Sequence, residues 1–132
     1  MNVAVIMRGL PGTGKSTIAR LLAGRDGAVH STNDYFVVGG RYRFDARLQK
    51  EYHAENFRAF VESLKRRVPV VVCDNTNIRY WNYQHYMGAA RKEGYQVHTI
   101  CMPHIDPSIA AVRSPHFVPV HHISLMLKGW ED

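Results

Sequence analysis

The segment from Gly9 to Ser16 restricts the possible folds of this chain more than any other feature. Its sequence, GLPGTGKS, fits the pattern G-x-x-x-x-G-K-[ST]. An apolar run, Val3 to Met7, precedes it and a helical pattern from Ser16 to Ala23 follows it, so the segment connects a strand to a helix. Glycines in such a loop let successive backbone N–H groups point at phosphate oxygens, assisted by the positive end of the helix dipole. The sequence therefore predicts a phosphate-binding loop.

The loop residues have separate expected roles. Lys15 is expected to reach the β- and γ-phosphates of a nucleoside triphosphate, and the Ser16 hydroxyl to join the ligands of Mg²⁺. The other loop residues expected at the nucleotide are Gly9, Pro11, Gly12, Thr13 and Gly14. ATP, or another nucleoside triphosphate, and Mg²⁺ are therefore the predicted cofactors.

Short apolar runs alternate with helical patterns along the rest of the chain. The further runs are 28–31, 68–73 and 96–102, and the further helical patterns are 45–67, 79–93 and 120–128, with a brief helix begun by Asp106-Pro107. The Gly39-Gly40 pair, which lies between short apolar pieces, predicts a turn or a small hairpin. Continuous apolar runs are typical of parallel strands covered on both faces. The pattern predicts an α/β fold, a three-layer domain with a small parallel sheet flanked by helices. At 132 residues, we expect one domain spanning 1–132.

The composition indicates which kinds of partner and which cellular location to expect. The formal net charge of +6 favours anionic partners such as nucleotides, nucleic acid or sugar phosphates. No apolar run is long enough to span a bilayer and the first residues lack a signal-peptide pattern, so we expect a cytoplasmic protein without membrane contact. Cys73 and Cys101 are interpreted as buried reduced thiols. No protein partner is evident.

An acidic residue ends the apolar run that leads into the DNTN segment. Asp74 follows Val70 to Cys73, and strand ends in a parallel sheet converge on the phosphate loop. We expect Asp74 to hold Mg²⁺ directly or through water. The alternative is that Asp74 only caps the turn that follows.

Four motifs together carry a resemblance to a known family. They are the phosphate loop, STNDYF at 31–36, GRYRFD at 40–45 and VVVCDNTNIRYW at 70–81. From Val3 to about Trp130 the chain resembles the small P-loop kinases related to polynucleotide 5'-hydroxyl kinase. The resemblance implies a P-loop NTPase/kinase domain with an arginine-bearing lid, at about residues 110–120.

The resemblance also assigns individual residues. Thr17 joins the nucleotide loop, Asp74 matches the acid after the third strand, and Arg113 matches the lid arginine, with Ser114 in place of the family's Asn. A lid arginine would neutralise charge on the transferring phosphoryl group. The alternative for Arg113 is a solvated residue at a helix end. His116 lies in the lid where the family can carry a further basic residue, and it would contribute only when protonated.

The family's general base is an Asp at the position that Asn33 occupies here. An amide orients a hydroxyl but does not accept its proton at neutral pH. Three explanations stay open: Asp34 is the base through an irregular backbone, Asn33 only positions the acceptor, or Asn33 is an engineered replacement that traps substrate. On a regular strand, neighbouring side chains point to opposite faces, which makes the first explanation depend on local backbone geometry.

Residues near this segment are candidates for acceptor binding. Tyr35 and Phe36 could stack on a base or sugar, or belong to the core. The remaining candidates are Arg41, Arg43 and Arg47 for acceptor phosphates, with Asn75 and Asn77 of the DNTN segment. His53 is interpreted as a core histidine and Trp81 as a packing residue.

Three functions follow from these observations. The leading hypothesis is Mg-ATP-dependent transfer of the γ-phosphate to the 5'-hydroxyl of RNA or DNA, with Asn33 weakening or silencing it. The second is a kinase for a small hydroxyl compound, such as a nucleoside or a sugar. The third is a nucleotide-dependent RNA-binding or regulatory module with weak catalysis.

Overall fold

The computed structural model describes residues 2–132 and follows the predicted alternation of strands and helices. In chain order the elements are β1 (Val3–Arg8), α1 (Lys15–Ala23), β2 (Ala28–His30), a 3₁₀ helix (Thr32–Phe36), β3 (Val37–Val38), β4 (Arg41–Tyr42), a second 3₁₀ helix (Ala46–Leu48), α2 (Gln49–Lys65), β5 (Val70–Asp74), α3 (Tyr80–Lys92), β6 (Gln96–Cys101), α4 (Pro107–Arg113) and α5 (Val120–Lys128). The predicted helix at 45–67 instead begins as the second 3₁₀ helix. The α/β fold class is confirmed.

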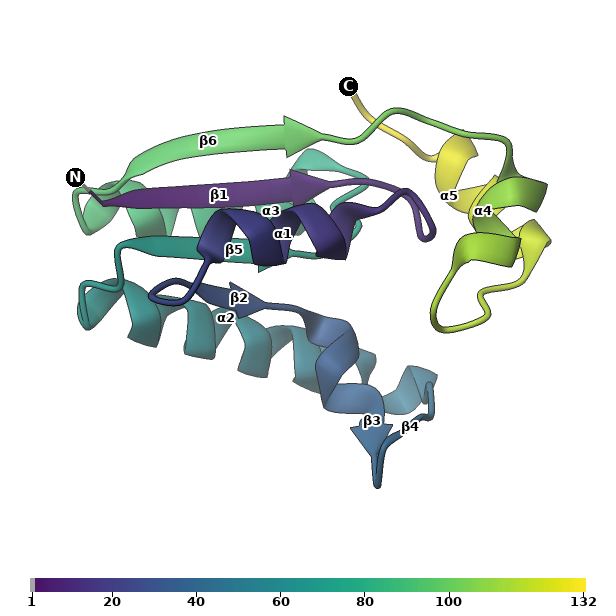
Figure 1. Cartoon of the computed structure of the whole chain (residues 1–132), viewed down its shortest axis with the longest axis horizontal. Coiled ribbons are helices and arrows are strands. Elements are labelled where there is room, and N and C mark those ends of the chain that lie inside the picture. The colour runs from purple at the N-terminus through teal and green to yellow at the C-terminus, as the bar shows by residue number, and fades with distance from the viewer. Residues whose placement is uncertain (1) are drawn as a thin grey trace.

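The central sheet has four parallel strands in the order β2-β5-β1-β6. Met7 of β1 lies opposite Asp74 of β5 and Ile100 of β6. Because all strands run the same way, their carboxyl ends share one edge, the side to which the arrowheads of Figure 1 point. The phosphate loop, Asp74 and the STNDYF segment all leave the sheet at this edge.

Helices cover the sheet unequally on its two faces. Helices α2 and α3 lie behind the sheet in Figure 1 and pack Phe60 and Tyr86 against Ile6 of β1. Helix α1 lies in front and packs Ala19 against Met7. Successive residues of a strand point to opposite faces, which explains why Ile6 and Met7 belong to different core clusters.

Helices α4 and α5 pack against each other beyond the carboxyl edge of the sheet (Figure 1). Their small core consists of Leu10 from the phosphate loop, Ala110 and Ile123. Asp106 caps α4 as predicted, because its side chain accepts a hydrogen bond from the Ser108 backbone N–H at 2.8 Å. The α4–α5 pair is therefore held directly against the phosphate loop.

A small hairpin, β3–β4, extends from the other side of the same edge. Gly39 and Gly40 form its two-residue turn with φ of 58° and 79°. Two consecutive positive φ angles fit a type I′ turn, which the Gly pair permits without strain. The predicted hairpin is confirmed.

Two predictions about single side chains are wrong. Trp81 is 68% exposed, because it lies in the first turn of α3 on the side away from the sheet. Cys101 is exposed on edge strand β6, whereas Cys73 is buried as expected. No helix within residues 2–132 is long and apolar enough to cross a membrane.

Candidate active site

A cavity of about 630 Å³ opens at the carboxyl edge of the sheet. Three segments line it: the phosphate loop with α1 as far as Arg20, the residues Ser31, Asn33 and Asp34, and the stretch from Arg113 at the end of α4 to Val118. Asp74 at the end of β5 also lines it. In open parallel sheets, ligands bind outside the carboxyl ends of the strands, which is where this cleft lies.

The backbone of the phosphate loop is tightly curled. Gly12 and Gly14 have φ of 81° and 86°, a region that residues with a Cβ rarely adopt. A Cβ added to Gly12 would lie 2.1 Å from the Ala110 carbonyl oxygen. Thr13 Oγ1 donates a hydrogen bond to the Leu10 carbonyl at 2.8 Å. The glycines thus permit both the curl and the close approach of α4.

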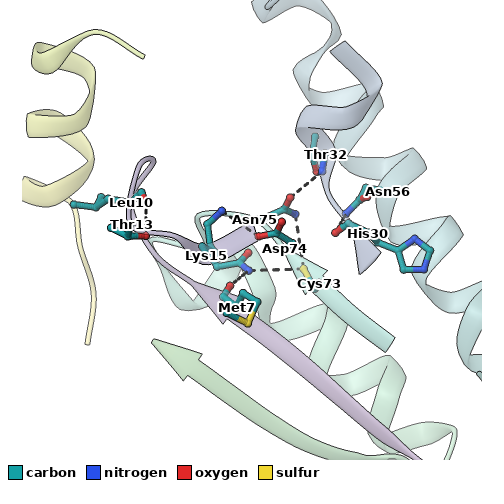
Figure 2. Close-up of polar contacts among 11 residues, drawn as sticks. Met7, Leu10, Thr13, Lys15, His30, Thr32, Asn56, Cys73, Asp74 and Asn75 are labelled. Carbon is teal, nitrogen blue, oxygen red and sulfur yellow. Dashed lines mark hydrogen bonds and ion pairs between the residues drawn. The ribbon is translucent and has the colours of Figure 1, made fainter. Parts of the chain in front are cut away.

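Lys15 and Asp74 form an ion pair on the floor of the cleft. Lys15 Nζ donates to Asp74 Oδ1 at 3.1 Å, and the two side chains are 10% and 3% exposed (Figure 2). Strand pairing explains the contact, because Asp74 lies beside Met7 and the loop returns Lys15 over the same edge. Asp74 therefore faces the phosphate loop.

The two asparagines of the DNTN segment lie beneath the cleft. Asn75 Oδ1 accepts a hydrogen bond from the Thr32 backbone N–H at 2.9 Å, and Asn77 Nδ2 donates to the Met7 carbonyl at 2.7 Å. Figure 2 shows Asn75 between the end of β5 and Thr32. Both side chains are buried and neither lines the cavity. This placement favours a structural role and disfavours the expected role in acceptor binding.

The buried thiol beside these asparagines is not a nucleophile. Cys73 accepts weak hydrogen bonds from the Asn75 and Asn77 side chains. Burial raises the pKa of the Cys73 thiol to about 12. The thiol therefore stays protonated at neutral pH.

The STNDYF segment forms a 3₁₀ helix, which brings both Asn33 and Asp34 to the cleft. A 3₁₀ helix has about three residues per turn, so neighbouring side chains diverge by about 120° rather than pointing to opposite faces. Burial raises the pKa of Asp34, and the negative charge of Asp74 raises it further. The irregular backbone required for an Asp34 base is therefore present.

Asn33 is held by the hairpin. The Tyr42 hydroxyl donates a hydrogen bond to Asn33 Oδ1 at 3.4 Å. The Tyr42 ring also stacks on His116, with ring centroids 3.9 Å apart and an interplanar angle of 20°. Burial lowers the pKa of His116, whereas the Asp34 charge raises it. Tyr42 thus joins Asn33 to the segment that follows α4.

Two arginines line the cleft, of which the sequence indicated one. Arg113 lies exposed at the end of α4 and lines the cleft, a placement that fits both the lid arginine and the solvated helix-end residue considered from the sequence. Arg20 was missed: it lies on α1, four residues after Ser16 and so on the same helix face. Its positive charge lowers the pKa of Asp34. The i to i+4 spacing from Ser16 is the signal that could have identified it.

The other expected acceptor residues lie outside the main cleft. Tyr35, Arg43 and Arg47 line a second pocket beside the hairpin, and Arg41 is exposed on β4. Asp45 binds the Arg47 guanidinium through both carboxylate oxygens, at 3.1 and 2.9 Å. The structure therefore separates the expected site residues into two neighbouring groups.

His53 is not a core residue, contrary to its interpretation from sequence. It lies at the surface of α2, with Nδ1 3.0 Å from the Thr32 hydroxyl oxygen. This contact supports the start of the 3₁₀ helix that carries Asn33 and Asp34. His53 itself does not line the cleft.

Comparison with known proteins places the chain in a family. NEDD4-binding protein 2 of Homo sapiens is 33% identical over 134 residues, which cover 98% of this chain but only 8% of that protein. Among solved structures, the Pnkp1/Rnl/Hen1 RNA repair complex superposes with a TM-score of 0.73 at 16% identity, covering 97% of this chain and 43% of that chain. A gluconokinase from Sinorhizobium meliloti 1021 gives a TM-score of 0.63 at 20% identity, covering 98% and 75%.

The solved structures share the fold of this chain. The match to a family model goes further, because it assigns a defined range of residues to the family. The AAA domain family matches residues 5–113, which include the phosphate loop, the 3₁₀ helix, Asp74 and Arg113. These are the segments that build the cleft. The chain therefore belongs to the AAA domain family, with the P-loop kinase fold that its sequence predicts.

Proposed function

We propose that this protein is a Mg-ATP-dependent kinase that transfers the γ-phosphate to the 5'-hydroxyl of RNA or DNA. One observation carries the proposal: a single cavity joins the phosphate loop to Asn33 and Asp34, with Arg20 and Arg113 also lining it. A phosphoryl donor and a hydroxyl acceptor need such a continuous space. Positioning and charge neutralisation are the main demands of phosphoryl transfer.

The chain's own groups fit a bound nucleotide with Mg²⁺. The curled loop and Lys15 would hold the phosphates, and the Ser16 hydroxyl and Asp74 carboxylate are the hard oxygen ligands that Mg²⁺ prefers. When bound, the metal would neutralise charge on the phosphates. Gly12 also supports this fit, because its missing Cβ leaves the loop free to curl beneath α4.

The acceptor end has groups for the remaining chemistry. The acceptor oxygen forms a bond to the γ-phosphorus, the bond to ADP breaks, and the hydroxyl proton passes to Asp34. The raised pKa of Asp34 makes its ionised carboxylate a stronger base than an ordinary carboxylate. Asn33 orients the hydroxyl by hydrogen bonding, and Arg113 neutralises negative charge on the phosphoryl group during its transfer.

The choice of a polynucleotide acceptor rests on charge and on relatives. The net charge of +6 favours a polyanion. The fold neighbour from an RNA repair complex and the resemblance of the DNTN and STNDYF segments to polynucleotide kinases support the same choice.

Transfer of a labelled phosphate tests the proposal. We expect γ-labelled ATP to label a 5'-hydroxyl oligonucleotide and not the same oligonucleotide carrying a 5'-phosphate. Lys15→Gln should abolish the labelling, with circular dichroism to confirm that the variant is folded. Absence of labelling for both RNA and DNA 5'-hydroxyl ends would refute the polynucleotide kinase.

A kinase for a small hydroxyl compound is the second candidate. The fold neighbour that is a gluconokinase and the cavity of about 630 Å³, a size usual for small-molecule sites, favour it. Under this alternative, a nucleoside or a sugar acid would accept the label and oligonucleotides would not. If no acceptor of either kind is labelled but ATP binds, the nucleotide-dependent regulatory module is the remaining candidate.

A further inference from the structure

A second pocket, of about 520 Å³, lies beside the hairpin. We call it the hairpin pocket; its lining includes Tyr35, Phe36, Arg43, Phe44, Arg47 and Tyr52. Four of these residues are aromatic and two are arginines. This combination of ring faces and positive charge is the one that single-stranded nucleic acids bind.

The aromatic side chains form a cluster with one open ring. Phe36 lies at the centre and is 2% exposed, with its ring centroid 4.7 Å from that of Tyr52 and 5.1 Å from that of Phe44. Phe44, in contrast, remains 55% exposed. Packing accounts for Phe36, but it does not account for a large ring left open to solvent at the pocket's edge.

The hairpin pocket adjoins the acceptor end of the main cleft. Tyr35 and Phe36 directly follow Asn33 and Asp34 in the same 3₁₀ helix, so the helix lines the cleft with one end and the pocket with the other. Tyr42 of β4 touches Asn33 and stacks on His116, so the hairpin also borders the cleft. A strand with its 5' end in the cleft can continue along this helix into the pocket.

Positive charge at the hairpin matches a phosphate backbone. In the part of the chain that the structure describes, Arg41 and Arg43 form no ion pair, whereas Arg47 is bound by Asp45. Arg41 and Arg43 are therefore the groups available to backbone phosphates, and Asp45 offsets the charge of Arg47.

We propose that the hairpin pocket binds a nucleobase downstream of the 5'-terminal nucleotide, stacked on Phe44, with Arg43 at the neighbouring phosphate. This inference rests on the proposed polynucleotide kinase activity and adds a strand-binding site outside the catalytic cleft. The pocket makes a short single strand a better acceptor than a single nucleotide, because only the strand reaches Phe44.

Acceptor length tests the inference kinetically. KM is measured for a nucleoside 3'-monophosphate and for 5'-hydroxyl oligoadenylates of increasing length, in ribo and deoxyribo series. We expect Phe44→Ala to raise the KM of the oligonucleotides about tenfold, the size expected for loss of one base–aromatic stack, and to leave the KM values of the mononucleotide and ATP unchanged. Phe44→Tyr should restore the low KM, and Leu21→Ala, which removes an exposed apolar side chain on α1, is the matched control.

A binding measurement separates failure of this inference from failure of the kinase. Quenching of a 2-aminopurine placed downstream of the 5' end should occur with the wild-type protein and be lost in Phe44→Ala. Transfer with no effect of Phe44→Ala on oligonucleotide KM would overturn the hairpin pocket and leave the kinase standing. Absence of both transfer and quenching would overturn both. Self-association of the wild type that Phe44→Ala abolishes would assign the pocket to a second copy of the chain and also overturn the inference.

Discussion

At the scale of single residues, the two carboxylates of the cleft have different environments. Asp74 is buried and paired with Lys15. Within residues 2–132 Asp34 forms no ion pair, and its partial burial and the Asp74 charge raise its pKa. Unlike environments commonly divide the roles of two nearby carboxylates. Asp74 is therefore suited to hold positive charge at the phosphates and Asp34 to accept a proton.

Exchanging the amide and the acid tests this division. Asp34→Asn should lower kcat by roughly a hundredfold to ten-thousandfold, the usual contribution of a general base. Asn33→Asp should give no comparable gain, because the base is already present next to it. Steady-state transfer to a 5'-hydroxyl oligonucleotide measures both variants. A hundredfold gain in Asn33→Asp with little loss in Asp34→Asn would instead identify position 33 as the vacant base position.

The pH profile gives an independent check on Asp34. Because the base must be ionised, kcat/KM should fall as pH falls through the Asp34 pKa. This acidic limb of the pH profile should lie at higher pH than it would for an ordinary aspartate. Arg20→Ala removes a positive charge that lowers this pKa, so the limb should move to higher pH. Arg91→Ala, on the last turn of α3, is the control and should not move it. A limb that stays in place in Arg20→Ala would contradict the assignment.

At the scale of elements, the turn after β5 connects the core to the cleft. Asn77 reaches across to the Met7 carbonyl of β1 and has φ of 49°, a left-handed conformation that Asn tolerates better than most residues. Asn75 supports the 3₁₀ helix through the Thr32 N–H. The DNTN segment thus fixes the spacing between the phosphate loop and the acceptor end.

Removing the Asn77 amide should therefore affect stability more than acceptor binding. Asn77→Ala leaves the buried Met7 carbonyl without its donor, so we expect a loss of about 1–3 kcal/mol in the free energy of unfolding. Urea denaturation measures this loss, and acceptor KM of the folded variant should stay near the wild-type value. A normal unfolding midpoint together with a large rise in acceptor KM would return Asn77 to the acceptor site.

The elements themselves were predictable because their signals are local. The continuous apolar runs, the Gly39-Gly40 turn and the Asp106 cap each depend on a few neighbouring residues, and all three were predicted. The 3₁₀ helix at 32–36 was not, because nothing in STNDYF itself distinguishes it from a turn. It depends on support from distant residues, Asn75 and His53.

Long-range contacts also explain why the sequence alone did not place some side chains. Asn75 and Asn77 looked available for acceptor binding because the sequence does not reveal that their amides bond to Thr32 and Met7. Trp81 was expected to pack but is exposed, whereas the ring centroid of Trp130 lies 4.5 Å from the Arg8 guanidinium. Arg8 and Trp130 are separated by more than a hundred residues along the chain.

At the scale of the whole molecule, the cleft lies between two attachments at the carboxyl ends of the sheet strands. The α4–α5 pair lies on one side and the β3–β4 hairpin on the other (Figure 1). Helix α4 ends in Arg113, and β4 contains Tyr42. The Tyr42 ring of the hairpin and the His116 ring between α4 and α5 stack on each other across the cleft. The net positive charge also belongs to the whole molecule, and it favours an anionic acceptor.

Salt dependence distinguishes a polymer acceptor from a small one. A polynucleotide releases counterions when it binds, so its KM should rise steeply with salt, whereas KM for a nucleoside should change little. The double variant Arg41→Ala with Arg43→Ala should reduce the slope of log KM against log salt concentration by about the amount expected for the loss of two phosphate contacts. Steady-state kinetics from low to physiological salt measure this, with Arg91→Ala as the control. An oligonucleotide KM that is independent of salt would contradict a backbone contact at the hairpin.

The most direct test of the central claim is an acceptor competition. A 5'-hydroxyl oligonucleotide, a nucleoside and gluconate compete for γ-labelled ATP in one reaction, and the kcat/KM ratio is obtained from the labelled products. We predict that the oligonucleotide takes most of the label and that nuclease digestion releases it on the 5'-terminal nucleotide. Preferential labelling of the nucleoside or of gluconate would contradict the account.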